Sequence, residues 1–200
     1  MSVLGLDLGG RKLAIGCFSE GGKLLSKDVF PLQRRTGKAV GELITSAVSA
    51  YKEQADSPVR SVGVSVPGIA RARTGTVWAP NIPGWEDYPI VAEIHEVVGN
   101  MPVGIDSDRA WCMLGELWQG NARGCRDAIY LAVGTGIGAG VFIDGNILRG
   151  AQDIAGAVGW MALDKPVPRA THWTLSWLHS RGPGALSTPK IKDSPCLEPV

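Results

Sequence analysis

The chain has 200 residues, an apolar fraction of 44% and a formal net charge of +1. This length allows one domain or two small ones, and the apolar fraction is ordinary for a globular core. A charge so close to neutral gives no sign of nucleic acid or an anionic membrane as a partner, and the apolar runs are too short to span a bilayer.

The first thirty residues predict three antiparallel strands joined by glycine turns. The strand-like apolar runs lie at 2–8, 11–18 and 23–30. The first turn contains Gly9-Gly10, and a tight glycine turn between two strands leaves bare backbone N–H groups that can approach a phosphate closely. Because Met1 leads directly into the first strand without a basic leader, we expect no signal peptide and a cytoplasmic location.

Helices and strands alternate after this point, each inferred from the spacing of its apolar positions and from its flanking turn residues. In chain order they are a helix over 37–54, a strand over 61–66 that ends in Pro67-Gly68, a short strand near 76–78, a helix over 89–98, a strand over 103–106 and a helix over 108–119 that Ser107 caps. This order predicts a mixed sheet with helices on both faces.

A second strand–turn–strand lies at 127–144, around Gly134-Thr135-Gly136-Ile137-Gly138-Ala139. The turn satisfies the dinucleotide pattern G-x-G-x-x-A, but that fingerprint needs a helix directly after the glycines. Here an apolar strand follows and ends in Asp144-Gly145, which is typical of a turn. No G-x-x-x-x-G-K-[ST] phosphate loop occurs in the sequence. Two glycine hairpins therefore indicate a duplicated phosphate-binding fold with a cleft between its halves.

The composition changes after residue 163, and six of the thirteen prolines lie within 165–200. Two explanations stay open: a mobile C-terminal segment, and a reading frame that slipped near residue 165 so that the true second half is lost. We therefore expect a first domain over 1–122, the start of a second domain over 123–164 and a poorly ordered tail over 165–200.

Four stretches, in order, resemble the ROK family of repressors, open reading frames and sugar kinases, in the actin-like ATPase superfamily. The first is Asp7-Leu8-Gly9-Gly10-Arg11-Lys12, which is similar to the family's first phosphate motif D-[IL]-G-G-T-K, with Arg11 in place of Thr. The second is 63–68 together with 79–85, which is similar to the family's sugar-side loop. The third is 106–116, which is similar to E-N-D-A-N-A-A-A-L-G-E, and the fourth is 134–138, which is similar to the family's second phosphate motif. The resemblance covers 3–163. It implies an α/β, ribonuclease H-like fold with a complete first domain and a partial second domain.

The resemblance implies ATP-dependent phosphorylation of a hexose or a related sugar, with ATP and Mg²⁺ as cofactors. Asp108 would be the catalytic base, although an acidic residue at a helix start is also common without any function. Asp7 would hold Mg²⁺ through water. Lys12 either adds positive charge near the phosphates or is a solvated strand residue. The implied phosphate-binding residues are Gly9, Gly10, Lys12, Gly134, Thr135 and Gly136.

The resemblance also implies sugar contacts from the loop and helix start. The residues are Pro67, Gly68, Asn81, Ser107 and Asp108. The Asn81 amide can both donate to and accept from vicinal hydroxyls, and it can equally be a turn residue between two prolines. The expected partner is a small-molecule sugar, with no nucleic acid and no membrane, and with a homodimer left open.

The chain departs from the family at several positions. Ala157 and Trp160 stand where ROK kinases have the Glu and His of A-G-E-[IL]-G-H. The Cys-rich zinc loop and the adenosine-binding loop have no counterpart, so we expect no zinc and a product that is inactive through truncation. The alternative is a non-catalytic sugar-binding or degenerate protein. A ROK repressor is less favoured, because no helix-turn-helix fits ahead of Asp7. The sequence names neither the sugar nor the phosphoryl donor.

Overall fold

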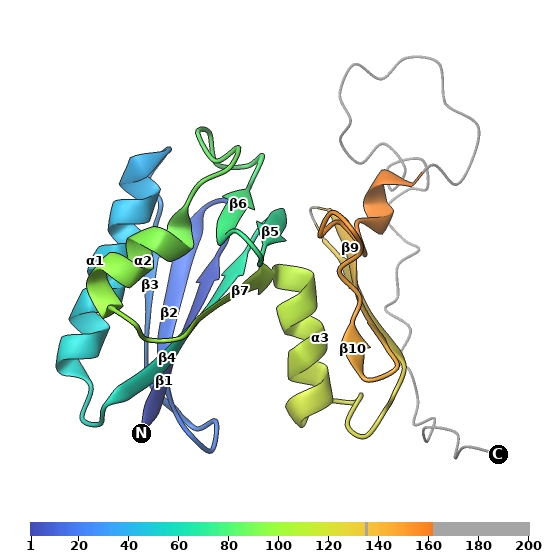
Figure 1. Cartoon of the computed structure of the whole chain (residues 1–200), viewed down its shortest axis with the longest axis horizontal. Coiled ribbons are helices and arrows are strands. Elements are labelled where there is room, and N and C mark those ends of the chain that lie inside the picture. Colours follow the sequence, from blue (N-terminus) through green and yellow to red (C-terminus); the bar gives the residue numbers. More distant parts are fainter. Residues whose placement is uncertain (135, 162–200) are drawn as a thin grey trace, which may run out of the picture. The chain divides into compact units, whose positions relative to one another are not determined.

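A computed structural model of the chain describes residues 1–134 and 136–161 (Figure 1). The chain divides into two compact units, of which the first holds Met1–Trp111 and Arg149–Ile154. The second holds Cys112–Leu148 and the described residues from Ala155 onward. The expected domain bounds stay predictions, and the expected tail over 165–200 lies outside the described residues.

The first unit is built on a five-stranded mixed sheet with the order β3-β2-β1-β4-β7. Its strands are β1 (Ser2–Leu8), β2 (Lys12–Ser19), β3 (Leu24–Pro31), β4 (Val59–Val66) and β7 (Val103–Ser107). The strands β1, β2 and β3 pair antiparallel, whereas β1, β4 and β7 run parallel. The predicted antiparallel trio is confirmed, and Ile105 lies on the parallel strand β7, which β4 separates from β1.

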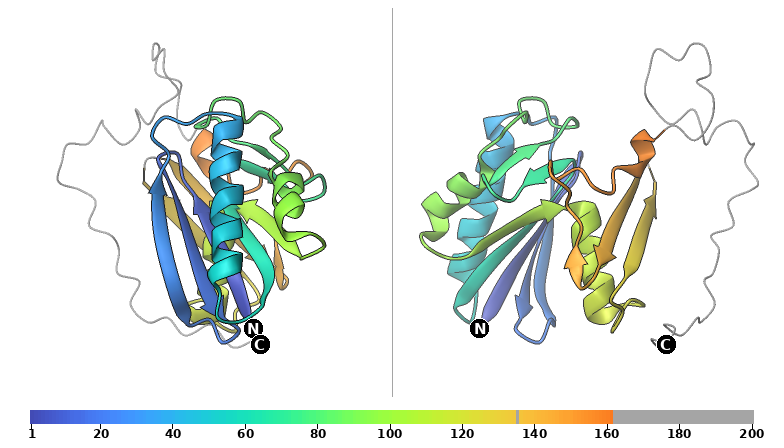
Figure 2. Two further views of the ribbon diagram at one scale, coloured as in Figure 1. Left: turned by 90° about the vertical axis from the view of Figure 1, so that its left-hand side faces the viewer. Right: turned by 45° about the vertical axis from the view of Figure 1, so that its right-hand side comes forward.

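Two helices, α1 (Lys38–Gln54) and α2 (Ile90–Val98), contact each other on one face of this sheet (Figure 2). Alternate strand residues point to that face, and helix residues three or four apart meet them. The resulting core includes Leu4, Leu6, Val62, Val64, Val40, Ile44 and Val48, all at most 3% exposed. The binary pattern of the sequence therefore fixes which face of the sheet is buried.

The opposite face carries a line of glycines across four strands. Pairing places Gly16 opposite Gly5, Gly5 opposite Gly63, and Gly63 opposite Gly104. A Cβ atom added at Gly5 would lie 3.1 Å from the Phe18 ring, and one added at Gly63 would lie 3.5 Å from the Trp111 indole. Aromatic rings therefore rest on the glycine backbone on this face.

A small hairpin of β5 (Ile69–Arg71) and β6 (Thr76–Trp78) extends the chain after β4. The loop that follows is fixed by Trp85, which is 1% exposed and whose ring stacks on Tyr88 at a centroid distance of 4.4 Å. The Trp85 Nε1–H donates to the Gly37 carbonyl at 3.0 Å. The loop over 79–85 is therefore tied to the start of α1.

The second unit begins within α3 (Asp108–Gln119) and contains a three-stranded sheet with the order β10-β9-β8. Its strands are β8 (Ala128–Val133), β9 (Ile137–Ile143) and β10 (Asn146–Ile147), and a short 3₁₀ helix, η1, follows at Val158–Trp160. The predicted turn at Asp144-Gly145 has left-handed φ values of 51° and 77°. In the described part of the chain, no helix is both long and apolar enough to cross a membrane.

Candidate functional site

Three polar side chains form a line where the parallel strands β1, β4 and β7 end. The register pairs Asp7 with Ser65, and Ser65 with Asp106. Directly paired residues share a face, and adjacent strands lie about 4.8 Å apart, so the Asp7 and Asp106 backbones are about 10 Å apart. The Ser65 hydroxyl donates to Asp7 Oδ1 at 3.1 Å. The carboxyl ends of parallel strands are a common place for ligands in open α/β sheets.

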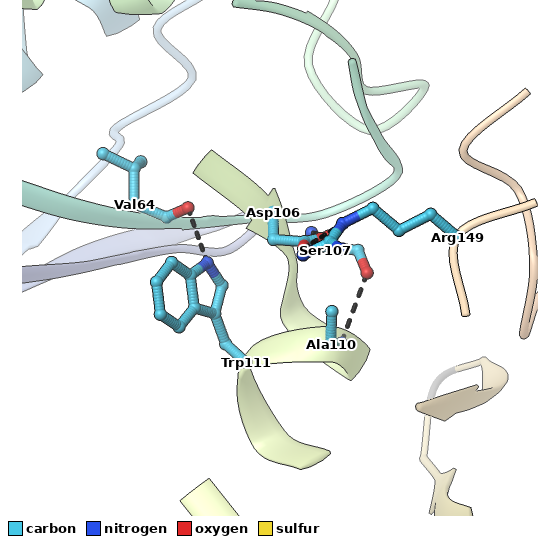
Figure 3. Close-up of polar contacts among 6 residues, drawn as sticks. All are labelled: Val64, Asp106, Ser107, Ala110, Trp111 and Arg149. Carbon is cyan, nitrogen blue, oxygen red and sulfur yellow. Dashed lines mark hydrogen bonds and ion pairs between the residues drawn. The ribbon is translucent and has the colours of Figure 1, made fainter. Parts of the chain in front are cut away.

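The junction of β7 and α3 lies directly beyond this line (Figure 3). The Ser107 hydroxyl accepts the Ala110 N–H at 3.3 Å, which is the geometry of an N-cap. The Trp111 indole N–H donates to the Val64 carbonyl at 2.9 Å and ties the first turn of α3 to β4. The predicted Ser107 cap is therefore confirmed by its hydrogen bond.

Asp108 is the first residue of α3 and is exposed. Its Oδ1 accepts the backbone N–H of Arg109 at 2.8 Å. Asp108 is thus a solvent-accessible carboxylate on a fixed helix start, at the same end of the sheet as Asp7.

Sequence reasoning missed the most buried charge of the junction. The Asp106 side chain is only 9% exposed, and its Oδ1 accepts the Ser107 N–H at 2.8 Å. Its Oδ2 accepts a hydrogen bond from Arg149 Nε at 2.9 Å and lies 2.7 Å from Arg149 Nη2 in an ion pair (Figure 3). Arg149 follows β10 but belongs to the first unit. This ion pair therefore ties the segment 149–154 to the residue that precedes Ser107 and Asp108.

The first glycine turn lies beside the loop over 79–85. The Gly9 N–H donates to the Lys12 carbonyl at 2.9 Å and closes the turn between β1 and β2. A Cβ atom added at Gly10 would lie 3.5 Å from the Asn81 Cβ, so the turn and the loop are in contact. Lys12 shares the face of Asp7, because Asp7 pairs with Ala14 two residues further along β2. The structure thus brings Asp7, Gly10, Lys12 and Asn81 to one end of the first unit.

Pro67 and Gly68 form the turn that follows β4. Gly68 has φ of 110°, and a Cβ atom there would collide with the Trp78 carbonyl oxygen. The backbone alone therefore requires glycine at this position. The sugar contacts expected of Pro67 and Gly68 stay predictions.

The second glycine turn belongs to the second unit and joins β8 to β9. The Gly134 N–H donates to the Gly136 carbonyl at 2.9 Å, and both glycines are exposed. Thr135 lies outside the described residues. Nearby, the Ala139 N–H donates to the Gly156 carbonyl at 2.7 Å, which places Gly156, the neighbour of Ala157, against β9. That this turn faces the same cleft as Asp7 and Asp108 stays a prediction.

Two tyrosines have clearly shifted pKa values, and both stabilise the fold. Burial, with a 2.7 Å hydrogen bond to Asp28, raises the pKa of Tyr51 to about 12. Burial and a 2.7 Å hydrogen bond to Glu93 also raise the pKa of Tyr88. Within residues 1–134 and 136–161, no cluster of three or more His, Cys, Asp or Glu side chains could hold a metal ion. A metal at this site would depend on Asp7, on water and on oxygen atoms of a ligand.

Comparison with known proteins gives one consistent result. The sequence profile of the ROK family matches residues 3–174. A glucokinase from Halalkalibacterium halodurans is 30% identical over 164 residues, which cover 78% of this chain and 48% of that protein. The crystal structure of a ROK hexokinase from Thermus thermophilus is 37% identical with a TM-score of 0.73, covering 86% of this chain and 56% of that one.

A crystal structure of a ROK family glucokinase from Streptomyces griseus, in complex with glucose and AMPPNP, is 30% identical with a TM-score of 0.72. It covers 82% of this chain and 51% of that one. The chain spans about half the length of the curated relatives that it matches. These similarities confirm the predicted actin-like α/β fold and the resemblance that the four motifs carry.

Proposed function

The chain belongs to the ROK family, and we propose that its protein transfers a phosphoryl group from ATP to a hexose or a related sugar. The observation that carries the proposal is the placement of Asp108, an exposed carboxylate on a capped helix start at the same sheet end as Asp7 and Lys12. A relative named glucokinase, and a similar ROK glucokinase solved with glucose and AMPPNP, support a sugar acceptor and ATP as the donor.

In this proposal Asp108 accepts the proton of the sugar hydroxyl as the oxygen attacks the terminal phosphorus. Its exposure allows it to reach a substrate, and the Ser107 cap fixes the helix turn on which it lies. Asn81 would bind sugar hydroxyls, together with Ser107 and the backbone of Pro67 and Gly68. The position of Asn81 against Gly10 supports this, because a sugar there would lie next to the phosphate-binding turn.

Asp7 is suited to Mg²⁺ held through water. Its Oδ1 accepts a hydrogen bond from Ser65, while Oδ2 has no hydrogen-bond partner among the described residues. A carboxylate oxygen is the hard ligand that Mg²⁺ prefers, and this ion commonly keeps several waters. When bound, the ion would neutralise charge on the phosphates that Gly9, Gly10 and Lys12 contact.

We propose that Gly134, Thr135 and Gly136, which belong to the second unit, also bind phosphate. We propose in addition that the protein is cytoplasmic, where ATP is available.

One departure favours a second candidate, a sugar-binding protein without catalysis. Ala157 provides a methyl group where ROK kinases have a carboxylate for sugar hydroxyls. A site built to hydrogen-bond a hydroxyl loses much of its discrimination when one of its polar groups is absent. In this candidate the chain would bind a sugar and ATP would not be consumed.

Two measurements on the purified chain separate these functions. A coupled assay follows ADP release with ATP and Mg²⁺ in the presence of glucose, mannose or N-acetylglucosamine, and isothermal titration follows binding of the same sugars. Sugar-dependent ADP release supports the kinase. Saturable sugar binding without ADP release supports the second candidate, and the absence of both refutes the proposal.

A further inference from the structure

A guanidinium group lies near the acidic side chains at the carboxyl ends of the parallel strands. Asp7, Ser65 and Asp106 pair in register two residues beyond the line of glycines, so their side chains share the glycine face of the sheet. Arg149 contacts Asp106 on this face (Figure 3). Asp108 begins α3 only two residues after Asp106. A positive charge is thus placed at the sheet end that carries three carboxylates.

The Asp106 carboxylate fixes the orientation of this guanidinium. Arg149 Nε donates to Asp106 Oδ2 at 2.9 Å, and Nη2 lies 2.7 Å from the same oxygen. The other carboxylate oxygen accepts the Ser107 N–H at 2.8 Å, so the carboxylate is itself held in place. A planar guanidinium that is bound along one edge has its remaining N–H groups in fixed directions. Arg149 is therefore a preoriented hydrogen-bond donor.

Part of the guanidinium remains free to bind a ligand. The Arg149 side chain is 42% exposed, whereas that of Asp106 is 9% exposed. The guanidinium has five N–H groups, and only Nε and Nη2 face Asp106. Nη1 makes no hydrogen bond with any residue of 1–134 or 136–161. At least two N–H groups of Arg149 can therefore donate to a bound molecule.

The charges around this end of the sheet favour an anion as that molecule. Lys12 lies on β2, on one side of β1, and shares the face of Asp7. Arg149 lies at β7, the edge strand on the other side. A phosphoryl group over the ends of β1 and β4 would have a cation on each side, which offsets the repulsion from the carboxylates. Arginine also matches phosphate oxygens with parallel N–H groups.

We propose that Arg149, oriented by Asp106, binds the phosphoryl group during its transfer and then the phosphate of the sugar phosphate product. This role rests on the proposed function. The sugar oxygen forms a bond to the terminal phosphorus of ATP, and Asp108 takes the hydroxyl proton. The bond from that phosphorus to the bridging oxygen breaks, and ADP keeps the electron pair. Arg149 donates hydrogen bonds to the transferred group and exchanges no proton.

The experiment compares two variants that differ only at Arg149. The single variant Asp106→Asn keeps a side-chain oxygen that can accept from Arg149. The double variant adds Arg149→Met and removes the guanidinium without leaving an uncompensated carboxylate. Arg126→Met is the control, because it removes an exposed arginine of the second unit. Isothermal titration measures the binding of glucose, mannose and N-acetylglucosamine and of their 6-phosphates.

We expect the double variant to bind the sugar 6-phosphate about five- to fiftyfold more weakly than Asp106→Asn, as for hydrogen bonds to a charged group. Both variants should bind the unphosphorylated sugar equally well, because Arg149 contacts only the phosphate. In the coupled assay the double variant should have a lower kcat and an unchanged KM for the sugar. Arg126→Met should match the wild-type chain in every measurement.

A role of Arg149 in stability alone predicts a different result. Affinity for the sugar and for its 6-phosphate would then fall by the same factor in the double variant, and that outcome would overturn the inference. Equal affinity of the single and double variants for the 6-phosphate would also overturn it, as would a wild-type chain that binds none of the three 6-phosphates.

The two proposals can fail separately. Formation of sugar phosphate from ATP, with no effect of Arg149→Met on 6-phosphate binding, would refute the role of Arg149 and leave the sugar kinase standing. Binding of a 6-phosphate that depends on Arg149, without transfer from ATP to any sugar, would support the phosphate site and refute the kinase.

Discussion

Replacing Arg149 by Met should destabilise the junction that carries Asp108. In the wild-type chain, Arg149 donates from Nε and Nη2 to one oxygen of Asp106, whose side chain is 9% exposed. Met keeps most of the length of the side chain and removes the charge. The substitution therefore leaves a buried carboxylate with the Ser107 N–H as its remaining hydrogen-bond donor among the described residues.

The expected cost follows from the burial of the two partners. Removing one member of a fully buried pair costs about 3–5 kcal/mol, because the other charge is left uncompensated. The Arg149 side chain is 42% exposed, so water can reach the carboxylate from that side. We therefore expect a loss of about 1–3 kcal/mol in the free energy of unfolding. For a chain of this size that corresponds to a decrease in Tm of roughly 3–9 °C.

The chain contains a matched control in Arg126, whose Nη2 lies 2.8 Å from Asp144 Oδ1. Both side chains of that pair are more than three-quarters exposed, at 78% and 77%. Arg126→Met should therefore cost less than about 0.5 kcal/mol. Urea unfolding followed by tryptophan fluorescence measures both variants against the wild-type chain.

A double variant separates charge from packing. Adding Asp106→Asn to Arg149→Met removes the uncompensated charge, so the double variant should be more stable than Arg149→Met alone. Equal destabilisation by Arg149→Met and Arg126→Met would refute this reasoning. A double variant less stable than Arg149→Met would also refute it.

Two further predictions concern the fold. Gly68→Ala should lower the free energy of unfolding in urea by about 2–4 kcal/mol, because φ is 110° and an added Cβ atom collides with the backbone there. The control Gly124→Ala has φ of 79° and open space around the added Cβ atom, so it should cost about 1 kcal/mol. Similar costs for the two variants would contradict the collision assigned to Gly68. Stability should decrease as the pH rises from about 10 to about 12, because the pKa of Tyr51 lies near 10 when unfolded and is raised to about 12 when folded. Tyr51→Phe, which also loses the hydrogen bond to Asp28, should show a weaker dependence of Tm on pH over that interval, and an unchanged dependence would argue against the linkage.

Local patterns in the sequence predict most of the first unit. Alternating apolar residues and a glycine turn define β1 and β2, and apolar residues at helical spacing define α1. The start of β4 at Val59 was missed, because the exposed Arg60 interrupts the apolar run. That end of the strand depends on pairing with Ser2, which no local pattern reveals. Strand β10 has two residues and is too short to produce a period.

In the candidate site, too, the sequence predicts some residues directly and gives no sign of others. Asp7, Ser107 and Asp108 belong to contiguous motifs, so the sequence indicates them directly. The partner of Asp106 is Arg149, which lies 43 residues away and follows a different strand. A single sequence has no local signal for such a contact, because only the return of the segment 149–154 to the first unit brings the two charges together.

The most direct test of the proposed function is the formation of a hexose phosphate from ATP, detected by mass spectrometry, by the wild-type chain and by Asp108→Asn. Asn is as favourable as Asp near a helix start, so the free energy of unfolding of Asp108→Asn should equal that of the wild-type chain. Loss of the base should lower the rate by about 10²–10⁴. The control Asp56→Asn, at an exposed position between α1 and β4, should leave the rate unchanged. The proposed function predicts sugar phosphate from the wild-type chain, which would overturn the inactivity expected of a truncated product, and almost none from Asp108→Asn. Equal formation by both chains would contradict the role of Asp108.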